Sequence, residues 1–233
     1  MTEAPFRVGF LLYPNLTQLD LTGPWEVFSR VPQSEVHLVW KDMDPVTADG
    51  GMRITPTATL ADAPAFDLLC VPGGPGQVAV MEDAAVLEFL CRQAETASYV
   101  TSVCTGSLIL AASGLLAGRR AACHWASRDQ LSLFGVTPVA ARVVEDGRFI
   151  SGGGVTAGID FALVAVARIW GEEIAQAIQL SMEYDPAPPW PAGSPGGAPA
   201  AVTARVTEAM AGFLEHRREV SVRAARRLAD REG

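Results

Sequence analysis

The sequence predicts an α/β fold, with a mostly parallel central sheet and helices on both of its faces. Length and composition are the first observation: 233 residues, 49% of them hydrophobic, suffice for one sizeable core. The second is that apolar runs of strand length recur along the chain. The third is that segments with helical periodicity follow most of these runs, an alternation typical of parallel sheets with helical connections.

The strands are predicted from short apolar runs that end at turn residues. The first run, FRVGFLLY, is continuously apolar and stops at Pro14, as expected for a strand buried on both faces. The run FDLLCVPGG ends in a glycine turn. Strands or shorter extended pieces are predicted at residues 6–13, 35–41, 52–60, 66–74, 99–103, 119–125, 136–147 and 148–154.

The helices are predicted from periodic apolar positions and from residues that favour helix ends. In the first helix, Thr22 or Gly23 is the expected cap and Pro24 the expected first helical residue. The second has an acidic start. Helices are predicted at residues 19–31, 81–97, 105–116, 155–171, 172–184 and about 202–231.

A Pro-rich segment interrupts this alternation near the end of the chain. Residues 185–201, DPAPPWPAGSPGGAPAA, contain six prolines and cannot join a sheet interior. Only one helix follows, so we interpret the segment as an arm and residues 1–233 as a single domain. Its apolar residues, Trp190 among them, suggest that the arm lies in a surface groove, either of its own subunit or of a dimer partner near the partner's active site.

Composition narrows the classes of function. A net charge of −8 makes nucleic acid an improbable partner, because phosphate binding needs a basic face. No signal peptide and no membrane span are predicted, so we expect a cytoplasmic protein that does not engage a membrane. Neither His37 nor His216 has metal-ligand spacing with a second ligand, and we expect no metal. Four cysteines without CxxC spacing indicate free thiols.

One of these cysteines stands at a corner between a strand and a helix. In YVTSVCTGSLIL, the apolar strand ends at Cys104 and the helical pattern begins at once. Such an elbow exposes a nucleophile above the sheet and places it at a helix N-terminus, which favours a thiolate with a lowered pKa and a strained backbone. Cys70, Cys91 and Cys123 lie within apolar patterns and are interpreted as structural.

Other loops are predicted at the same end of the sheet as Cys104, where the strands have their carboxyl ends. Ligands of parallel sheets bind at the carboxyl ends of the strands. Asp20 follows the first strand, Gly74 lies in the glycine turn, and Gly153 follows the last strand. We therefore expect these residues near Cys104.

Four segments together resemble a known family: FLLYPNLTQLDLTGPWEVF, CVPGG, TSVCTGSLILAASGLLAGRRAACHW and GGGVTAGIDFAL. They are similar, in order, to the DJ/PfpI superfamily of class I glutamine amidotransferase-like proteins. Within it, the chain resembles the bacterial isocyanide hydratases, also in QLSMEYDPAPPWPAGSP. The resemblance implies a flavodoxin-like α/β sandwich, a homodimer, Cys104 as nucleophile with Asp20 as its acidic partner, and no cofactor or metal. The implied reaction hydrates an isocyanide to an N-substituted formamide.

This chemistry suits the residues at the elbow. A Cys104 thiolate can add to the terminal isocyanide carbon and give a covalent thioimidate, while Asp20 moves protons and activates water. Backbone N–H groups at Gly74 and Thr105 are expected to stabilise charge on the intermediate. Gly153 and Val155 are expected to line the pocket floor. The substrate is expected to be small and apolar.

Several alternatives stay open at the level of sequence. Asp20 is equally suited to a turn or helix cap. Thr105 occupies the position where protease-like relatives carry histidine, and His124 is a structural residue that could also approach the site. Asp160 is expected to bond backbone or an arginine. The chain also resembles the sensor halves of AraC-type regulators, without their DNA-binding part, and Cys104 could instead serve a redox or stress sensor.

Overall fold

A seven-stranded sheet forms the centre of the molecule, in the order β10-β11-β7-β6-β1-β2-β5. The computed structural model describes residues 4–232. The strands are β1 (Phe6–Leu11), β2 (Ser34–Trp40), β5 (Ala58–Thr59), β6 (Leu68–Val71), β7 (Tyr99–Val103), β10 (Val143–Asp146) and β11 (Phe149–Gly152). Neighbouring strands are parallel except β10, which is antiparallel to β11. The predicted mostly parallel α/β fold is confirmed.

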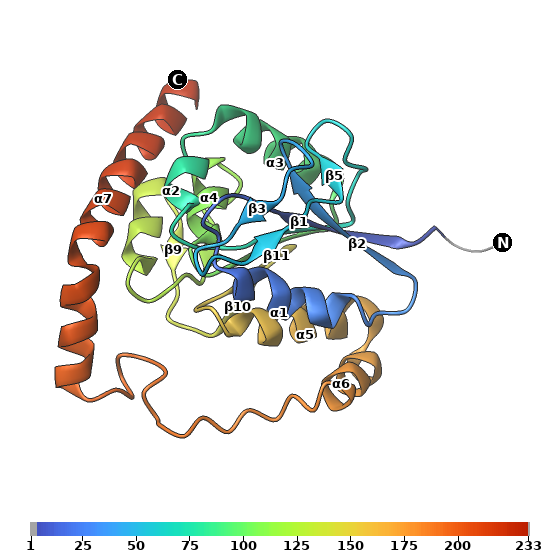
Figure 1. Ribbon diagram of the computed structural model, residues 1–233. Helices are drawn as coiled ribbons and strands as arrows, with labels where there is room; N and C mark the ends of the chain where they lie inside the picture. The colour runs from blue at the N-terminus through green and yellow to red at the C-terminus, as the bar shows by residue number, and fades with distance from the viewer. Residues whose placement is uncertain (1–3, 233) are drawn as a thin grey trace.

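Helices cover both faces of this sheet (Figure 1). One layer contains α1 (Gln18–Phe28) and α5 (Ala157–Trp170), which pack against each other, with α6 (Glu172–Ser181) against α5. The opposite layer contains α2 (Gln77–Val80), α3 (Ala84–Thr96) and α4 (Gly106–Ala112). The remaining elements are the pairs β3 (Val46–Thr47) with β4 (Arg53–Ile54) and β8 (Arg120–Ala121) with β9 (Thr137–Pro138), and the 3-10 helix η1 (Arg128–Phe134).

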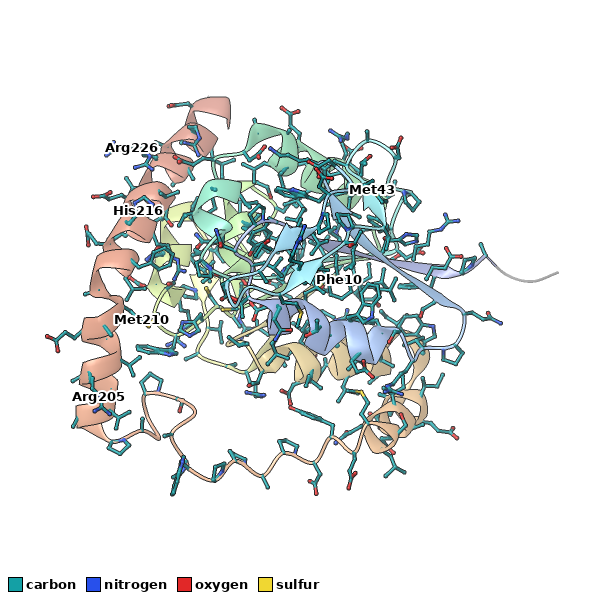
Figure 2. All side chains as sticks on the ribbon, viewed as in Figure 1. Phe10, Met43, Arg205, Met210, His216 and Arg226 are labelled. Atoms are coloured by element: carbon teal, nitrogen blue, oxygen red, sulfur yellow. The ribbon has the colours of Figure 1, made fainter. Side chains whose placement is uncertain are left out.

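Aromatic side chains join the sheet to the α1–α5 layer. The ring centroid of Phe28 lies 6.3 Å from that of Phe10 and 6.2 Å from that of Phe161. All three side chains are fully buried, and Figure 2 shows Phe10 in the interior. Because Phe10 belongs to β1 and Phe161 to α5, this stack sets how α1 lies over the sheet.

The start of α1 differs from the sequence prediction. We expected Thr22 or Gly23 to cap the helix and Pro24 to begin it, but the helix begins at Gln18 and Pro24 lies inside. The reason is tertiary: the N–H of Thr17 donates to Gly73 O at 2.9 Å, and the N–H of Asp20 donates to Thr17 O at 3.0 Å. Contact with a distant loop thus sets where the first turn forms, and it places Asp20 in that turn.

Two other predicted helices are shorter than expected. The helix predicted at 105–116 ends at Ala112, and Gly114 then takes a positive φ of +87°. The helix predicted at 81–97 begins at Ala84, because the Asp83 side chain caps it by accepting the Val86 N–H at 3.4 Å. The preceding turn forms the separate helix α2.

The Pro-rich arm and the last helix, α7 (Ala200–Glu232), run along the outside of the fold (Figure 1). Residues 184–199 contain no helix or strand. The later part of α7 packs on the body through the buried residues Val220, Ser221 and Ala224, and it is also held by ion pairs. These join Arg218 to Asp129 (3.1 Å), Arg223 to Glu82 (3.0 Å) and Arg227 to Glu82 (3.2 Å). The first half of α7 is largely exposed.

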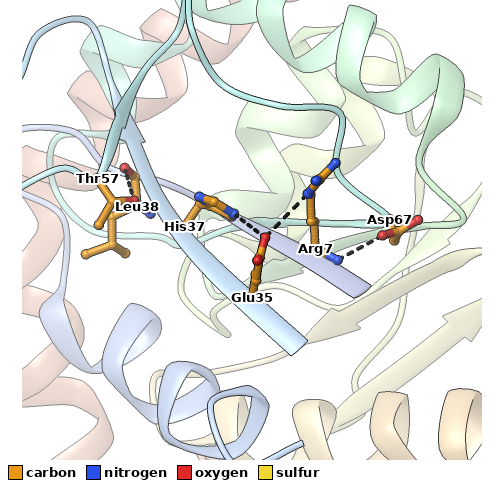
Figure 3. A network of polar contacts seen from close by, with 6 residues as sticks. All are labelled: Arg7, Glu35, His37, Leu38, Thr57 and Asp67. Carbon is orange, nitrogen blue, oxygen red and sulfur yellow. Dashed lines mark hydrogen bonds and ion pairs between the residues drawn. The ribbon is translucent and has the colours of Figure 1, made fainter. Parts of the chain in front are cut away.

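A polar network occupies the amino ends of β1 and β2 (Figure 3). Nε of Arg7 lies 3.5 Å from Oε2 of Glu35, and the Arg7 backbone N–H donates to Asp67 Oδ2 at 2.8 Å. His37 joins it, with Nε2 3.7 Å from Glu35 Oε2. These amino ends lie opposite to the carboxyl ends of the strands, where Cys104 lies, so His37 has a structural role.

Candidate active site

Cys104 lies at a strained corner between β7 and α4. Its φ is +56°, a left-handed conformation that is unfavourable for a residue with a side chain. Its N–H donates to Gly152 O at 3.0 Å, which ties the corner to β11. Gly106 makes the tight turn possible, because a Cβ at this position would lie 2.0 Å from Val71 O. The elbow expected from SVCTGS is therefore present.

Buried hydroxyl groups support the elbow from behind. Ser102 and Ser107, on either side of Cys104, share a hydrogen bond of 2.9 Å. Ser107 also donates to Ala122 O at 2.6 Å, and the Ala122 N–H donates to Ser151 Oγ at 2.8 Å. This chain joins β7, α4 and β11, so the strained conformation of Cys104 is held from several directions.

Asp20 projects its carboxyl into the same site from the first turn of α1. It is fully buried, and its Oδ2 accepts the N–H of Gly73 at 2.9 Å. Because this partner lies 53 residues away, the alternative of a local turn or cap for Asp20 is wrong. Its Oδ1 makes no conventional hydrogen bond with the side chains and backbone that the structure describes.

Burial makes Asp20 an acid that can change its charge near neutral pH. Loss of water around the carboxylate raises its pKa from 3.8 to about 7, although the Gly73 hydrogen bond and the interaction with the Cys104 thiol lower it. The carboxylate of Asp49 adds to the rise. An acid–base group with such a pKa can both accept and return a proton at physiological pH.

The pKa of Cys104 differs from our expectation. We expected a lowered value at a helix N-terminus, but burial raises the pKa of the thiol well above its usual value, and the negative charge of Asp20 raises it further. The N–H of Thr105 and the charge of Arg217 oppose this rise only in part. The side chain is 5% exposed, and desolvation of the thiolate outweighs the short α4 helix. Cys104 is thus a neutral thiol at rest, and it would need a base to react as a thiolate.

The glycine turn after β6 brings Asp20 and the elbow together. A Cβ at Gly73 would lie 2.5 Å from Thr105 N and 2.8 Å from Asp20 Oδ2. At Gly74, φ is +136° and the N–H donates to Thr105 Oγ1 at 3.0 Å. The Gly74 N–H, which we expected to stabilise an intermediate, is therefore already bonded. The Thr105 N–H faces the Cys104 sulfur and lowers the thiol pKa.

A cavity of about 580 Å³ lies beside this cluster. Gly153 and Val155, which we expected at the pocket floor near Cys104, line this cavity, and the Gly153 N–H donates to Arg142 O at 2.9 Å. Neither Cys104 nor Asp20 is part of its lining. The cavity lining and the elbow are joined through the backbone. Gly152 O accepts the Cys104 N–H, and Gly152 directly precedes the lining residue Gly153. The remaining lining residues are Cys123, His124, Trp125, Arg128, Ala140, Ala141, Arg142, Gly154, Thr156 and residues 193–196 of the arm.

Polar and apolar side chains both line the cavity. His124 lines it, and burial together with Arg217 lowers the pKa of its imidazole, which favours the neutral form. The Arg142 Nε donates to Asp160 Oδ2 at 2.7 Å, as expected for Asp160. The pKa values of Cys123 and Cys70 are raised to about 12 by burial, so both are neutral thiols. Within residues 4–230, no cluster of three potential metal ligands is present.

Arg217 approaches the elbow from the far end of the chain and was not predicted from the sequence. Arg217 of α7 is 4% exposed, and its guanidinium bonds to Gln77 and Ser127, which are both fully buried. One signal was available: Arg217 falls on the same helical face as Val220, Ala224 and Leu228. An arginine on an otherwise apolar face indicates a buried guanidinium.

Comparison with known proteins identifies the family of this chain. The DJ-1/PfpI family model matches residues 6–168, and the chain belongs to the DJ-1/PfpI family. It is 51% identical to an isonitrile hydratase from Pseudomonas putida, over 95% of this chain and 97% of that protein. Among solved structures, a ThiJ/PfpI family protein from Pseudomonas syringae matches with a TM-score of 0.91 and 43% identity, covering 93% of this chain and 90% of that one.

The chain is also similar to transcriptional regulators. It is 33% identical to the HTH-type transcriptional regulator GbdR from Pseudomonas aeruginosa over 78% of this chain, but only 51% of the regulator is covered. Among residues 4–232, no helix combines the length and hydropathy that a bilayer crossing requires.

Proposed function

We propose that this chain hydrates isocyanides to N-substituted formamides, R–NC + H₂O → R–NH–CHO, with Cys104 as nucleophile and Asp20 as general acid and base. The observation that carries the proposal is the buried Asp20 carboxyl beside the Cys104 thiol, with a pKa of about 7. The similarity to the P. putida isonitrile hydratase supports it, since isonitrile and isocyanide name the same R–N≡C group.

The first half of the reaction uses the high pKa of the thiol. The Asp20 carboxylate takes the proton from Cys104 as the sulfur bonds to the terminal carbon of the isocyanide. The protonated Asp20 then delivers this proton to the same carbon. The product is the thioimidate Cys104–S–CH=N–R, and Asp20 is again a carboxylate. The S–H bond has been added across one carbon, so no external proton is needed.

The second half consumes water. The Asp20 carboxylate removes a proton from a water molecule as the water oxygen attacks the thioimidate carbon, and the protonated Asp20 then gives this proton to the nitrogen. Collapse of the tetrahedral adduct breaks the C–S bond and releases the formamide, while the hydroxyl proton of the adduct passes through Asp20 to the departing sulfur. Thr105 supports this step, because its N–H faces the Cys104 sulfur. A cycle of this kind leaves both side chains in their starting states.

The cavity beside the elbow is proposed to hold the R group. Gly153 and Val155 line it, Gly153 directly follows the residue that accepts the Cys104 N–H, and Trp125 supplies an aromatic face. Residues 193–196 of the arm line the same cavity, which supports the proposal that the arm contributes to the substrate site of its own subunit. This arrangement favours an R group larger than a simple methyl.

We also propose a homodimer and a cytoplasmic location. The arm and the first half of α7 expose apolar side chains, with Trp190 74% and Val206 41% exposed. A second copy of the chain would cover this surface, and analytical ultracentrifugation tests it. The cytoplasm keeps thiols reduced, which a cysteine nucleophile requires.

The test is direct. Purified protein is incubated with an aryl or alkyl isocyanide, and formamide is followed by NMR while intact-protein mass spectrometry looks for the adduct on Cys104. We expect catalytic formamide formation and an adduct mass equal to the protein plus the whole isocyanide. Absence of turnover with several R groups would refute the proposal. The sensor alternative predicts oxidation of Cys104 without turnover, and the raised thiol pKa disfavours it because the thiolate is the form that is oxidised.

A further inference from the structure

Arg217 is a buried cation without a carboxylate partner. Its Nε donates to Gln77 Oε1 at 2.8 Å, its Nη1 donates to Ser127 Oγ at 2.7 Å, and its Cζ lies 4.5 Å from the centre of the Phe213 ring. Within the described side chains, no acid lies within ion-pairing distance of it. By contrast, the neighbouring Arg218 pairs with Asp129 on the surface. Burying a guanidinium costs free energy unless the group is hydrogen-bonded and its charge interacts favourably with its surroundings. We therefore expect a group near Arg217 that its charge stabilises.

The two partners of Arg217 belong to the two segments that flank the elbow. Gln77 begins α2, three residues after Gly74 in the glycine turn that holds Asp20. Ser127 closes the segment that carries Cys123 and His124, and its N–H donates to His124 O at 2.9 Å. The Arg217 side chain of α7 therefore donates hydrogen bonds to both of the segments that flank the elbow.

The charged and titratable groups around Arg217 come from several elements. Its charge lowers the pKa values of Cys104 and Cys123, opposes protonation of His124, and lowers the pKa of Tyr13, whose hydroxyl donates to Pro72 O at 2.8 Å. Burial keeps the Tyr13 hydroxyl and the Cys123 thiol neutral. Further charges act on these groups: Asp20 on Cys104, Asp49 on Asp20 and Tyr13, and Arg128 on Cys123.

Among these groups, only Cys104 gains negative charge in the proposed reaction while lying near Arg217. Its sulfur becomes anionic as Asp20 takes the proton and again when the C–S bond breaks. A fixed cation that is not neutralised by an acid stabilises both states, and it does so in a site from which water is excluded.

From this geometry we infer that Arg217 is a positioning residue for the nucleophile. It holds the Gly74–Gln77 and Cys123–Ser127 segments together and supplies the positive charge that stabilises the Cys104 thiolate. The inference rests on the proposed function for its role in turnover, but its effect on the thiol is measurable without any isocyanide.

The experiment measures the reactivity of Cys104 as a function of pH. The full-length protein is treated with iodoacetamide from pH 6 to 10, and modification of the Cys104 peptide is followed by mass spectrometry. Arg217→Gln removes the charge, Arg217→Lys retains it, and Arg218→Gln is the matched surface control. A rise of one unit in thiol pKa reduces the thiolate fraction about tenfold. We expect Arg217→Gln to react about tenfold more slowly at pH 8, whereas the other two variants stay close to wild type.

A second variant covers the case in which Arg217→Gln does not fold. Gln77→Glu has the same shape, still accepts the Arg217 hydrogen bond, and places a negative charge on the guanidinium. We expect it also to slow alkylation of Cys104 and to shift the pH profile upward. An unchanged profile in Gln77→Glu, or in a folded Arg217→Gln, would overturn the inference.

The outcomes separate this inference from the proposed function. If the wild type forms no formamide but the Cys104 profile shifts in Gln77→Glu, the proposed function fails and the role of Arg217 in thiolate stabilisation stands. If formamide forms and no variant shifts the profile, the reverse holds. When both stand, Arg217→Gln should lower kcat about tenfold with little change in KM, because the charge acts on the nucleophile and not on the bound substrate.

Discussion

Replacing Asp20 with asparagine should stabilise the protein at alkaline pH and remove its activity. The carboxyl is fully buried, and its pKa is raised from 3.8 to about 7. Because the folded pKa is the higher one, the folded state binds more protons than the unfolded state between these two values. The free energy of unfolding therefore falls as the pH rises toward 7 and is constant above it. Asparagine keeps the shape and can still accept the Gly73 N–H, but it does not ionise.

The expected size follows from the pKa. Each pKa unit corresponds to about 1.4 kcal/mol. The folded pKa of Asp20, about 7, lies two pH units above pH 5 (7 − 5 = 2). Between pH 5 and pH 8 the free energy of unfolding of the wild type falls over these two units. It should therefore lose roughly 3 kcal/mol relative to Asp20→Asn over this interval. The Cys104 thiol, with its raised pKa, stays protonated throughout and does not contribute.

Urea unfolding at both pH values, followed by tryptophan fluorescence, measures this difference. Comparing wild type with Asp20→Asn cancels every other titrating group. Asp49→Asn should keep most of the pH dependence, because Asp49 is exposed and its carboxylate is the smallest of the causes that shift the Asp20 pKa. In the same samples kcat should fall about 100-fold or more in Asp20→Asn. A double difference below about 1 kcal/mol would show that the carboxyl is not held in the state that the proposed acid–base role requires.

Four further predictions concern the site and its support. The kcat/KM of the wild type should decrease below an apparent pKa of about 7, because Asp20 must start as a carboxylate, and an unchanged rate at pH 5 would contradict this. Cys104→Ala and Cys104→Ser should abolish turnover with unchanged circular dichroism; near-normal rates would exclude the covalent route. Gly74→Ala should destabilise the fold by more than about 2 kcal/mol, because φ is +136° and the new Cβ would lie 2.3 Å from Thr17 N. Gly212→Ala, in open space on α7, should instead stabilise the fold by up to about 1 kcal/mol. Equal melting temperatures of the two variants would refute the packing argument. Ending the chain before Asp185 removes the arm and α7 and should cause aggregation or loss of activity, and a soluble, active truncation would show that neither is needed.

The elbow at Cys104 could be predicted because its signal is local. The run YVTSV, the small residues Thr105 and Gly106, and the following helical pattern all lie within about a dozen residues of Cys104. Strand, turn and helix propensities agree there, and the left-handed φ of Cys104 and the close approach of Gly106 to Val71 are what such an elbow requires. The mostly parallel sheet could be predicted for the same reason, since each of its longer strands is a continuous or alternating apolar run.

Residues that act through distant partners could not be assigned in this way. Asp20 was placed on the correct rim, but its hydrogen bond to Gly73 and the true start of α1 depend on a loop more than fifty residues away. Arg217 was assigned no role from the sequence. Its burial against Gln77 requires contact across 140 residues of sequence, which no local pattern specifies.

The sequence by itself determined the order of strands and helices, the elbow at Cys104 and the family resemblance, because these depend on periodicity and on residues that are neighbours in the chain. Only the tertiary structure decided the protonation of the site. The same burial that brings Asp20, Cys104 and Arg217 together also removes water from them. The pKa of Cys104 is therefore raised instead of lowered, and the pKa of Asp20 is raised to about 7. Desolvation depends on everything packed around a group, and for this reason it is a property of the fold rather than of any segment.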